Sequence, residues 1–388
     1  MAIPITYNLR NLRVRKTTTI MTALGIALTV AVLAGILALV NGLRSALTVT
    51  ANPLHVLIMR QGSTAELTSI VDDAKFQTVK FLDGIQTLDG EPMASHELVT
   101  VISLPLIDPP DEEVNVNVRG ISAMGIKMRE NVSLLSGRWF QTGKREVVVG
   151  RGLASVHKNV AMGDKIRIGR GDWEIVGIID GGKSGYNSEI WGDNNLTTLD
   201  LDRGSTRSSI LLRAKDDVAV QSLINRAETD QRLLMEGLRE TEYYARQTES
   251  ATPVEGLGIF VAIIMAVGSS FAAMNTMYAA VARRSKEVGV LRLLGFSRWS
   301  ILFSFLLESL LLSVLGGLLG CLLVLPLNGL ESRMGNLITF SHMTFEFQVS
   351  PAILAAGVAF SAIMGIIGGV MPAQMAARRE VLASLRDL

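Results

Sequence analysis

One segment of the chain carries the residue types of a phosphate-binding loop. Residues 177–184 read Gly-Ile-Ile-Asp-Gly-Gly-Lys-Ser, which matches the pattern G-x-x-x-x-G-K-[ST], and an apolar stretch precedes them. In such a loop, backbone amides and the lysine bind nucleotide phosphates, and the N-terminus of a following helix completes the anion site. The residues that follow here, 185–193, include two glycines and are a poor helix start. We therefore predict a glycine-rich turn that binds no nucleotide.

The remaining residues with catalytic or metal-binding side chains are scattered. The four histidines have no Cys, Asp or Glu at ligand spacing, and there is no Ser-His-acid order and no G-x-S-x-G sequence. Paired carboxylates such as Asp72-Asp73 and residues 111–113 lie in polar, turn-like stretches, where solvated loops are the usual structure. The sequence therefore predicts no catalytic residue, no metal site and no directly bound cofactor.

Glu308 is the one charged residue of an otherwise apolar window, residues 299–330. An ionised carboxylate in the middle of a membrane costs roughly 2.5–3.5 kcal/mol on insertion scales, so such residues face a bundle interior or a cavity. Glu308 could contact a substrate or a proton, or it could be a polar group near the cytoplasmic end that a neighbouring helix satisfies. Its position ten residues after Arg298 favours the second interpretation.

Four windows are long and apolar enough to cross a membrane: residues 17–43, 256–282, 299–330 and 347–377. Each exceeds the roughly 20 residues that a bilayer core of about 30 Å requires. The first could instead be a signal peptide, but its 21 uncharged residues, 20–40, exceed a typical signal core. We predict a membrane α-helical protein with four transmembrane helices and a large α+β extracytoplasmic domain between helices 1 and 2.

Small residues recur four positions apart in every window. Such pairs let helix backbones approach closely in lipid, within one bundle or across a dimer. The pairs are Ala31 and Gly35, Gly268 and Ala272, Gly316 and Gly320, and Gly365 and Gly369.

The basic residues predict the orientation. Basic residues gather before the first window, between the second and third, and in the tail 378–388, and cytoplasmic loops carry such an excess. The first group is Arg10, Arg13, Arg15 and Lys16. Both termini are therefore expected in the cytoplasm of a multi-pass inner-membrane protein. The net charge of +1 does not indicate nucleic-acid binding, and the single cysteine, Cys321, lies in the third window.

Residues 44–255 have the patterns of an α+β domain, with two subdomains expected. Predicted strands cover 55–59, 98–106, 114–118, 146–149, 165–168, 173–179 and 208–213, with a hairpin turn at 169–172. Residues 217–249 are rich in helix formers, and Val218, Leu223, Ala227, Leu234 and Leu238 roughly share one face. We predict a helical stalk over 217–249.

The segment 283–298 between the second and third windows combines basic residues with an apolar stripe. Val288, Leu291 and Leu294 recur every third residue, Gly295 is a helix stop, and Ser297 is a helix start. The basic residues alone could be explained by a cytoplasmic loop, because such loops carry an excess of Lys and Arg. The stripe instead indicates a short helix that docks in a partner's groove or lies on the membrane surface.

The sequence MNTMYAAVARRSKEVGVLRLLGF at 274–296 resembles the signature of MacB/FtsX-type ABC transporter permeases. Seven residues match that pattern in order: Arg284, Glu287, Val288, Gly289, Val290, Arg292 and Gly295. The resemblance extends to NLRNLRVRKTTTIMTALGIALTVA, to ESLLLSVLGGLLG, to PAQMAARREVLASLRDL, and outside the membrane to SGRWF, KREVVVGRGLA and GDKIRIGRGDWEIVGII. It departs at Leu293-Leu294, where the family often has alanine.

The resemblance implies a permease subunit that couples ATP hydrolysis to movement of its extracytoplasmic domain. Its partners would be a separate cytoplasmic ATPase that carries ATP and magnesium, a second permease subunit, the lipid bilayer and an extracytoplasmic adaptor, with no nucleic acid. The permease domain would span 256–377, after residues 1–43 and 44–255. The implied ATPase-coupling residues are Arg284, Lys286, Glu287, Val288, Gly289, Leu291, Arg292, Leu294 and Gly295, with the N-terminal basic residues beside them.

Two alternatives stay open at this point. A membrane-anchored receptor or sensor would bind a ligand outside and signal through the 283–298 loop. A membrane-bound enzyme ranks behind it, because no group of residues in the sequence supports one.

Overall fold

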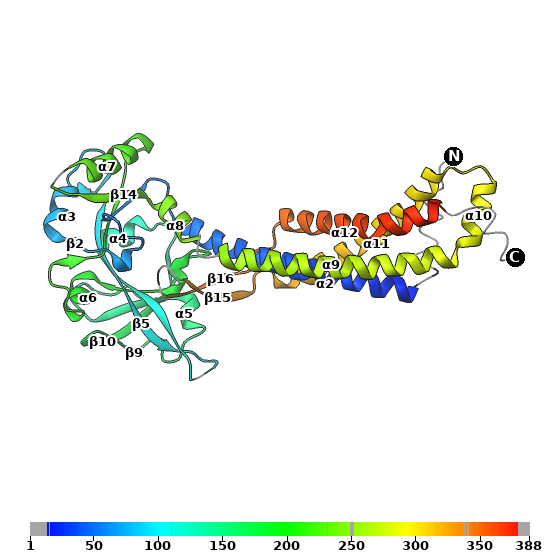
Figure 1. Cartoon of the computed structure of the whole chain (residues 1–388). Coiled ribbons are helices and arrows are strands. Elements are labelled where there is room, and N and C mark those ends of the chain that lie inside the picture. The colour runs from blue at the N-terminus through cyan, green and yellow to red at the C-terminus, as the bar shows by residue number, and fades with distance from the viewer. Residues whose placement is uncertain are drawn as a thin grey trace. The chain divides into compact units, whose positions relative to one another are not determined.

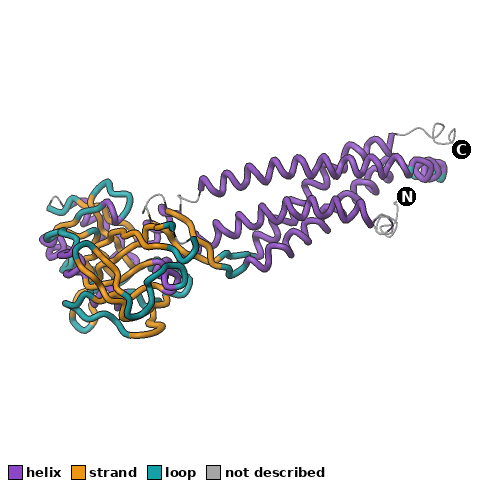
Figure 2. Tube along the Cα trace, turned by 90° about the horizontal axis from the view of Figure 1, so that it is seen from below, coloured by secondary structure: helices purple, strands orange, loops and turns teal. Residues whose placement is uncertain are grey.

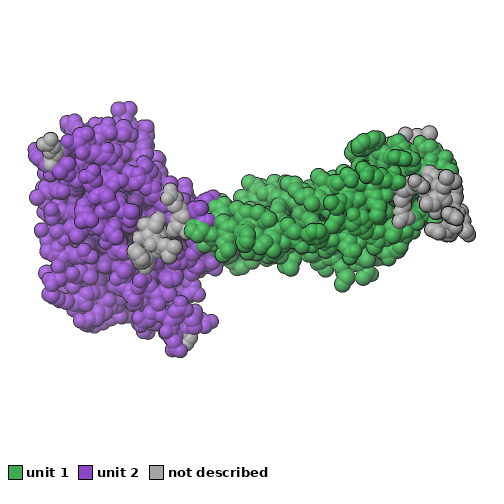
Figure 3. Space-filling view, viewed as in Figure 1, with its two compact units in different colours: residues 1–41, 253–330, 347–388 green, residues 42–252, 331–346 purple. Residues whose placement is uncertain are grey.

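The structure is a computed structural model that describes residues 14, 16–109, 111–230, 232–248, 252–336, 339 and 341–378. Arg10, Arg13, Arg15 and the tail beyond Arg378 therefore lie outside the described residues. Backbone contacts divide the chain into two compact units (Figure 3). We call residues 1–41, 253–330 and 347–388 the membrane unit, and residues 42–252 and 331–346 the exterior unit.

The membrane unit is built from long apolar helices, shown side by side in Figures 1 and 2. The structure contains four helices of sufficient length and hydropathy to cross a bilayer, which confirms the predicted spans. They are α2 (Lys16–Thr50), α9 (Thr252–Arg283), α11 (Arg298–Val324) and α12 (Pro351–Arg378).

Glycines bring three of these helices close together, as the small-residue spacing predicted. A Cβ added at Gly316 or Gly320 of α11 would lie 2.8 Å from the Ala23 carbonyl oxygen or 2.6 Å from that of Ala27, both in α2. Gly365 and Gly369 of α12 face α11 in the same way: their added Cβ atoms would clash with Ser313 and Ser309, respectively. The Ser309 hydroxyl also donates to the Gly365 carbonyl at 2.7 Å. Close backbone contact thus holds α11 between α2 and α12.

The pair Gly268 and Ala272 in α9 behaves differently. Both residues are exposed, and a Cβ added at Gly268 would meet nothing within 4 Å in the described chain. Elsewhere α9 does contact α2: a Cβ added at Gly258 would clash with the Ile36 side chain, and hydroxyl groups join Thr29 to Ser269 at 2.8 Å and Thr22 to Thr276 at 3.1 Å. The small-residue face of α9 is therefore open within this chain.

The exterior unit is organised around a mixed ten-stranded sheet with the order β14-β1-β13-β5-β6-β11-β8-β10-β7, and β9 pairs with β10. Every strand predicted from the sequence is present. The strands are β1 (His55–Arg60), β5 (Ala94–Pro105), β6 (Glu113–Ile121), β7 (Ser133–Gly137), β8 (Glu146–Gly150), β9 (Lys165–Ile168), β10 (Gly171–Asp180), β11 (Glu189–Asp193), β13 (Ser209–Arg213) and β14 (Met235–Arg239).

Strand β5 belongs to both halves of this sheet. Its first residues, 94–97, pair with β13, and residues 98–105 pair with β6. Separate buried clusters form on the two halves: one includes Val56 and Leu212, and another includes Val118 and Trp173. The two halves expected from the sequence thus share one continuous strand.

Short helices and strands surround the sheet. They are η1 (Glu66–Thr68), β2 (Val71–Asp72), α3 (Asp73–Val79), β3 (Thr87–Leu88), β4 (Glu91–Pro92), α4 (Ala123–Met128), α5 (Arg151–Ala154), η2 (Gly185–Ser188), α6 (Asn194–Asp200), β12 (Thr206–Arg207), α7 (Asp217–Thr229) and α8 (Glu240–Thr248).

The prediction of one helical stalk over 217–249 is wrong. The segment forms α7, then β14, which pairs with β1, then α8. Of the residues expected on one helical face, Val218 and Leu234 are 80% and 56% exposed. Gly237 allows β14 to pack closely against α7. A Cβ at this position would lie only 3.1 Å from the Ile224 Cα. Sheet pairing has overridden helix propensity.

The connection between α11 and α12, expected within the permease domain 256–377, contains a β-hairpin that belongs to the exterior unit. It consists of β15 (Glu331–Asn336) and β16 (Ser341–Glu346). The Ser188 hydroxyl accepts from the Thr344 amide at 2.8 Å, and a Cβ at Gly185 would meet the Met343 side chain at 2.5 Å. The sequence analysis missed the hairpin, although Met343, Phe345 and Phe347 alternate with polar residues, because residues 331–346 were treated only as a loop between two spans.

Candidate functional site

The predicted short helix exists as α10 (Ser285–Leu293) and runs across the end of the bundle (Figure 1). It ends in a Schellman motif: the Phe296 amide donates to the Leu291 carbonyl, and the Gly295 amide donates to the Arg292 carbonyl, both at 3.1 Å. Gly295 has φ = +91°, a conformation that glycine adopts without steric cost. The Ser297 hydroxyl then caps α11 by accepting from the Ser300 amide at 3.2 Å. Both local signals are confirmed.

The inner face of α10 packs into the membrane unit. Val288 is 2% exposed and lies in a cluster with Met277, Val281 and Phe305, and Gly289 is also buried. The stripe Val288, Leu291 and Leu294 is therefore not one exposed surface, because its first residue belongs to the core.

The outer face of α10 carries a different apolar set. Val290, Leu293 and Leu294 are 52%, 58% and 65% exposed, and their spacing of three and four residues places them on one side of a helix. The neighbouring Arg283 and Lys286 are also exposed, whereas Arg292 is half-buried. We call Val290, Leu293 and Leu294, with their basic neighbours, the α10 outer face. It has the composition of a docking surface: an apolar centre with a charged rim.

Arg284 and Glu308 form a buried ion pair beneath α10. The Arg284 Nη1 lies 2.8 Å from the Glu308 Oε2, and the two side chains are 6% and 5% exposed. Arg284 also contacts Glu287 at 3.1 Å, and its guanidinium lies 5.0 Å from the Phe305 ring centroid. Arg284 lies between α9 and α10, and Glu308 lies in α11. The ion pair therefore attaches the turn between α9 and α10 to α11. This geometry supports the interpretation of Glu308 as a polar group that a neighbouring helix satisfies.

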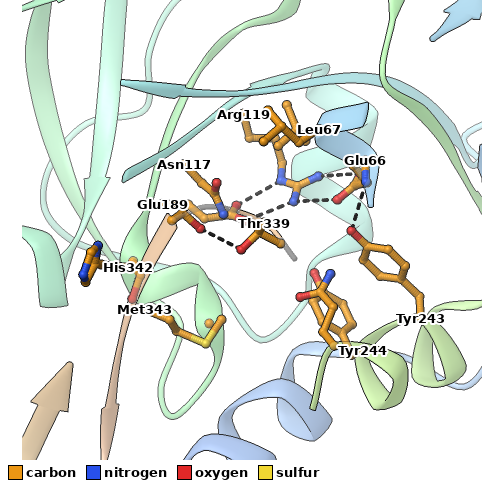
Figure 4. A pocket seen from close by; sticks show the side chains of 15 residues that line it. Glu66, Leu67, Asn117, Arg119, Glu189, Tyr243, Tyr244, Thr339, His342 and Met343 are labelled. Carbon is orange, nitrogen blue, oxygen red and sulfur yellow. Dashed lines mark hydrogen bonds and ion pairs between the residues drawn. The ribbon is translucent and has the colours of Figure 1, made fainter. Parts of the chain in front are cut away.

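A larger buried charge cluster lies in the exterior unit, and Figure 4 shows three of its members, Arg119, Glu66 and Glu189. Arg119 of β6 pairs with Glu66 at 3.0 Å, Glu97 at 2.9 Å and Glu189 at 2.9 Å, and its side chain is 3% exposed. Arg129 after α4 pairs with Glu97 at 2.7 Å. We call these two arginines and three glutamates the Arg119 cluster. It joins η1, β5, β6 and β11, so it connects segments from both halves of the sheet.

Further hydrogen bonds satisfy the carboxylates of the Arg119 cluster. The Ser209 hydroxyl donates to Glu66 at 2.5 Å, and the Trp191 indole donates to Glu189 at 2.7 Å. Burial opposes the ionisation of Glu97, but Arg129 and Arg119 hold its pKa below the usual value. The adjoining cavity of about 30 Å³ has room for little more than a water molecule. The arrangement therefore supports the fold and offers no space for a substrate.

The segment 177–184 does not form a phosphate-binding loop. Its first residues end strand β10, and the short 3-10 helix η2 and strand β11 follow, so no α-helix presents its N-terminus to an anion. Asn187 fills the turn: its side-chain oxygen accepts from the Gly181 amide at 2.8 Å, and its amide donates to the Gly182 carbonyl at 2.6 Å. The prediction of a glycine-rich turn is confirmed. Within the described ranges, no three His, Cys, Asp or Glu residues meet as potential metal ligands.

The sequence analysis missed the Arg119 cluster and the partner of Glu308. Arg119 and Glu189 are 70 positions apart, and Arg284 and Glu308 are 24 apart. The available signal was compositional: single charges in apolar stretches, such as Arg119 after Val114–Val118, must find partners when buried.

The four long apolar helices and the exterior sheet define the chain as a multi-pass membrane protein with a large exterior domain. Two family models agree: the MacB-like periplasmic core domain matches residues 19–230, more than half of the chain, and the FtsX-like permease C-terminal model matches residues 259–381. The chain belongs to the MacB/FtsX-type family of ABC transporter permeases.

Similar proteins include a macrolide export ATP-binding/permease protein MacB from Pasteurella multocida, 28% identical over 70% of this chain and 43% of the relative. The MacB of Bradyrhizobium diazoefficiens is 27% identical over 81% of this chain and 50% of its own. The chain thus spans about half the length of these two relatives. An uncharacterized ABC transporter permease from Methanocaldococcus jannaschii is 24% identical, with 98% and 97% of the two chains covered. Among solved structures, the periplasmic region of MacB from Actinobacillus actinomycetemcomitans aligns with a TM-score of 0.38 and 12% identity, over 50% of this chain and 92% of that one.

Proposed function

We propose that an ATPase docks on the α10 outer face and drives this permease, so that ATP hydrolysis in the cytoplasm moves the exterior unit. The supporting observation is the exposure of Val290, Leu293 and Leu294 on a helix whose other face is anchored by Val288 and Arg284. A docking helix must be fixed to the bundle on one side and free on the other, and α10 has both properties. ATP and magnesium would bind to the ATPase, which we propose is a separate subunit.

This proposal places α10 and both termini on the cytoplasmic side of the inner membrane, because basic residues gather there. The exterior unit would then engage a substrate or an adaptor protein outside the cytoplasm. The transported or extracted substrate is not specified by the α10 site.

The docking proposal is tested by co-purification of the full chain with its ATPase. Replacing Leu293 and Leu294 together by Asp should abolish the association and the permease-dependent ATP hydrolysis. Val218→Asp is the matched control, since Val218 is 80% exposed on α7 of the exterior unit. Val288 is unsuitable for this test, because a charge at its buried position would disrupt the membrane unit. Unchanged association of the Leu293/Leu294 variant would refute docking on this face.

We also propose that a second permease subunit packs against the open face of α9. Gly268 and Ala272 are exposed and four residues apart, an arrangement that favours close helix contacts in lipid. Cys321 is the only cysteine of the chain, so Cys321→Ser provides a background without thiols. Ala272→Cys in that background should form a disulfide-linked dimer in membranes, whereas Leu322→Cys on α11, which is 61% exposed, should not. Equal cross-linking at both positions would indicate random collision.

A further inference from the structure

The exterior unit contains a second cavity, much larger than the one beside the Arg119 cluster. Its volume is about 520 Å³, within the range of roughly 300–1,000 Å³ that small-molecule sites occupy. Residues of α3, the start of β5, and the N-terminal ends of α4 and α6 line it, together with Arg207 of β12. We call it the α3–α6 cavity.

Charges of both signs line this cavity. The positive groups are Lys80 and Arg207, and the negative groups are Asp73, Glu91 and Asp193. A cavity for a purely apolar molecule would not need them, and a site for a simple anion or cation would carry mainly one sign. The lining therefore selects a ligand that carries both charges.

Arg207 is a partly buried cation with incomplete compensation. Its side chain is 12% exposed, its Nη1 lies 3.6 Å from Asp73, and its Nη2 donates to Asn195 at 2.9 Å. The Nε has no hydrogen-bond partner among the described residues. Burial lowers the pKa of Arg207 despite the attraction of Asp73 and Asp193. A ligand carboxylate would pair with the Arg207 guanidinium, whose charged form is disfavoured by burial.

Of the other charged groups, Asp193 is buried and caps α6 by accepting from the Leu196 amide, whereas Asp73, Glu91 and Lys80 are accessible. The Asp73 side chain is 46% exposed, and Glu91 is exposed. Lys80 has no ion pair within the described part of the chain, and its Nζ lies 5.7 Å from the Phe76 ring centroid. Asp73 and Glu91 can thus receive a ligand ammonium group, and Lys80 can assist Arg207 with the carboxylate.

The cavity also has an apolar part. Phe76 stacks on His96 with a centroid distance of 4.9 Å, and Ala94, Ile121 and Met124 contribute further apolar surface. Burial lowers the pKa of His96 to about 4, so its ring is neutral at physiological pH and adds no charge to the lining.

We infer that the α3–α6 cavity binds a small zwitterion with an apolar body, of which an apolar α-amino acid is the simplest example. The carboxylate faces Arg207 and Lys80, the ammonium faces Asp73 and Glu91, and the apolar side chain lies against Phe76. This site is independent of the α10 outer face, so it can be measured without the ATPase.

The experiment uses the purified full chain in detergent and isothermal titration with three probes of one skeleton. L-phenylalanine carries both charges, phenethylamine lacks the carboxylate, and 3-phenylpropanoate lacks the ammonium. L-phenylalanine should bind with a Kd of about 1 mM or lower. Each singly charged probe should bind at least about ten-fold more weakly, because it loses its contact with either the positive or the negative groups of the lining.

Arg207→Met should abolish L-phenylalanine binding, and Arg170→Met should leave it unchanged. Arg170 is the matched control because it is 72% exposed and pairs with Asp202 outside the cavity. The inference is overturned if L-phenylalanine does not bind, if a singly charged probe binds equally well, or if both variants lose binding alike.

A second measurement avoids variants that could misfold. A photoreactive phenylalanine analogue should label wild-type residues 73–80 or 121–124, and free L-phenylalanine should compete with it. Labelling that is confined to other segments would contradict this site.

Discussion

In the membrane unit one buried guanidinium meets one buried carboxylate, whereas in the exterior unit two guanidiniums share three carboxylates. The Arg284–Glu308 pair is balanced, and it joins a helix corner to the neighbouring helix. The Arg119 cluster has an excess negative charge and joins strands from both halves of a sheet. Removing one arginine therefore has different consequences in the two units.

The difference follows from how buried charges are stabilised. A balanced pair can be replaced by two apolar side chains of similar size at little cost, because the desolvation penalty disappears with both charges. A shared arginine cannot be removed in this way, since Glu66 and Glu189 would lose their arginine together and Glu97 would keep only Arg129. The exterior unit depends on one residue more strongly than the membrane unit does.

Arg119→Met should therefore destabilise the chain more than any other single substitution in the two sets of buried charges. We expect a loss of about 5 kcal/mol in the free energy of unfolding of the exterior unit, at the upper end for a broken buried pair. Denaturant titration of the full chain in detergent, followed by the fluorescence of the buried Trp173 and Trp191, measures it. Arg170→Met is the control, because its exposed pair with Asp202 should contribute less than about 1 kcal/mol. Equal effects of the two substitutions would show that the cluster does not support the sheet.

Glu308→Leu should cost about 3 kcal/mol, because it leaves Arg284 buried without its main partner. The double variant Arg284→Leu/Glu308→Leu should recover at least half of this loss. Thermal unfolding of the two variants in detergent, measured by circular dichroism of the helices, makes the comparison. A double variant that is less stable than Glu308→Leu would mean that the charges themselves stabilise the corner.

Local features of the sequence were enough to predict the helical spans and the ends of α10. Gly295 and Ser297 act through hydrogen bonds to residues a few positions away, so their roles follow from nearby sequence. Apolar runs such as Glu146–Gly150 likewise predicted strands, because burial on a sheet needs only the run itself.

Features that depend on distant partners could not be predicted. The strand β14 forms because β1 pairs with it, although its own residues favour helix. Val288 and Leu294 share a sequence spacing, but the packing of Met277 and Phe305 decides that only Val288 is buried. The α3–α6 cavity is another such feature, since Asp73 and Arg207 meet only in the folded chain.

The membrane unit contains glycines in close helix contacts and glycines on an open helix face, and substitution should affect stability differently at the two kinds of position. Gly320→Leu should cost about 1–3 kcal/mol, because its Cβ alone would lie 2.6 Å from the Ala27 carbonyl oxygen and α2 must move away. Gly268→Leu should leave monomer stability unchanged or raise it slightly, since nothing in the described chain lies within 4 Å of its Cβ. The same thermal unfolding assay applies. If Gly268→Leu destabilises the chain only at high protein concentration, a second subunit occupies the α9 face.

The smallest expected effect is a pH dependence that belongs to the exterior unit alone. Burial, with a contribution from Arg207, lowers the pKa of His96 to about 4, from its ordinary value of 6.5. Between these two values the unfolded chain binds more protons than the folded chain, so stability falls as the pH decreases from 6.5 to 4. From His96 we expect a loss of roughly 1 kcal/mol between about pH 7.5 and about pH 6.0, and His96→Gln should remove this part of the slope. Burial also lowers the pKa of His157, so a smaller slope of the same sign should remain. Denaturant titrations at both pH values measure the slope, with His342→Gln as the control. Glu97 of the Arg119 cluster should not contribute in this range, because Arg129 and Arg119 hold its pKa below the usual value. A slope that is unchanged in His96→Gln would assign the titration to another group.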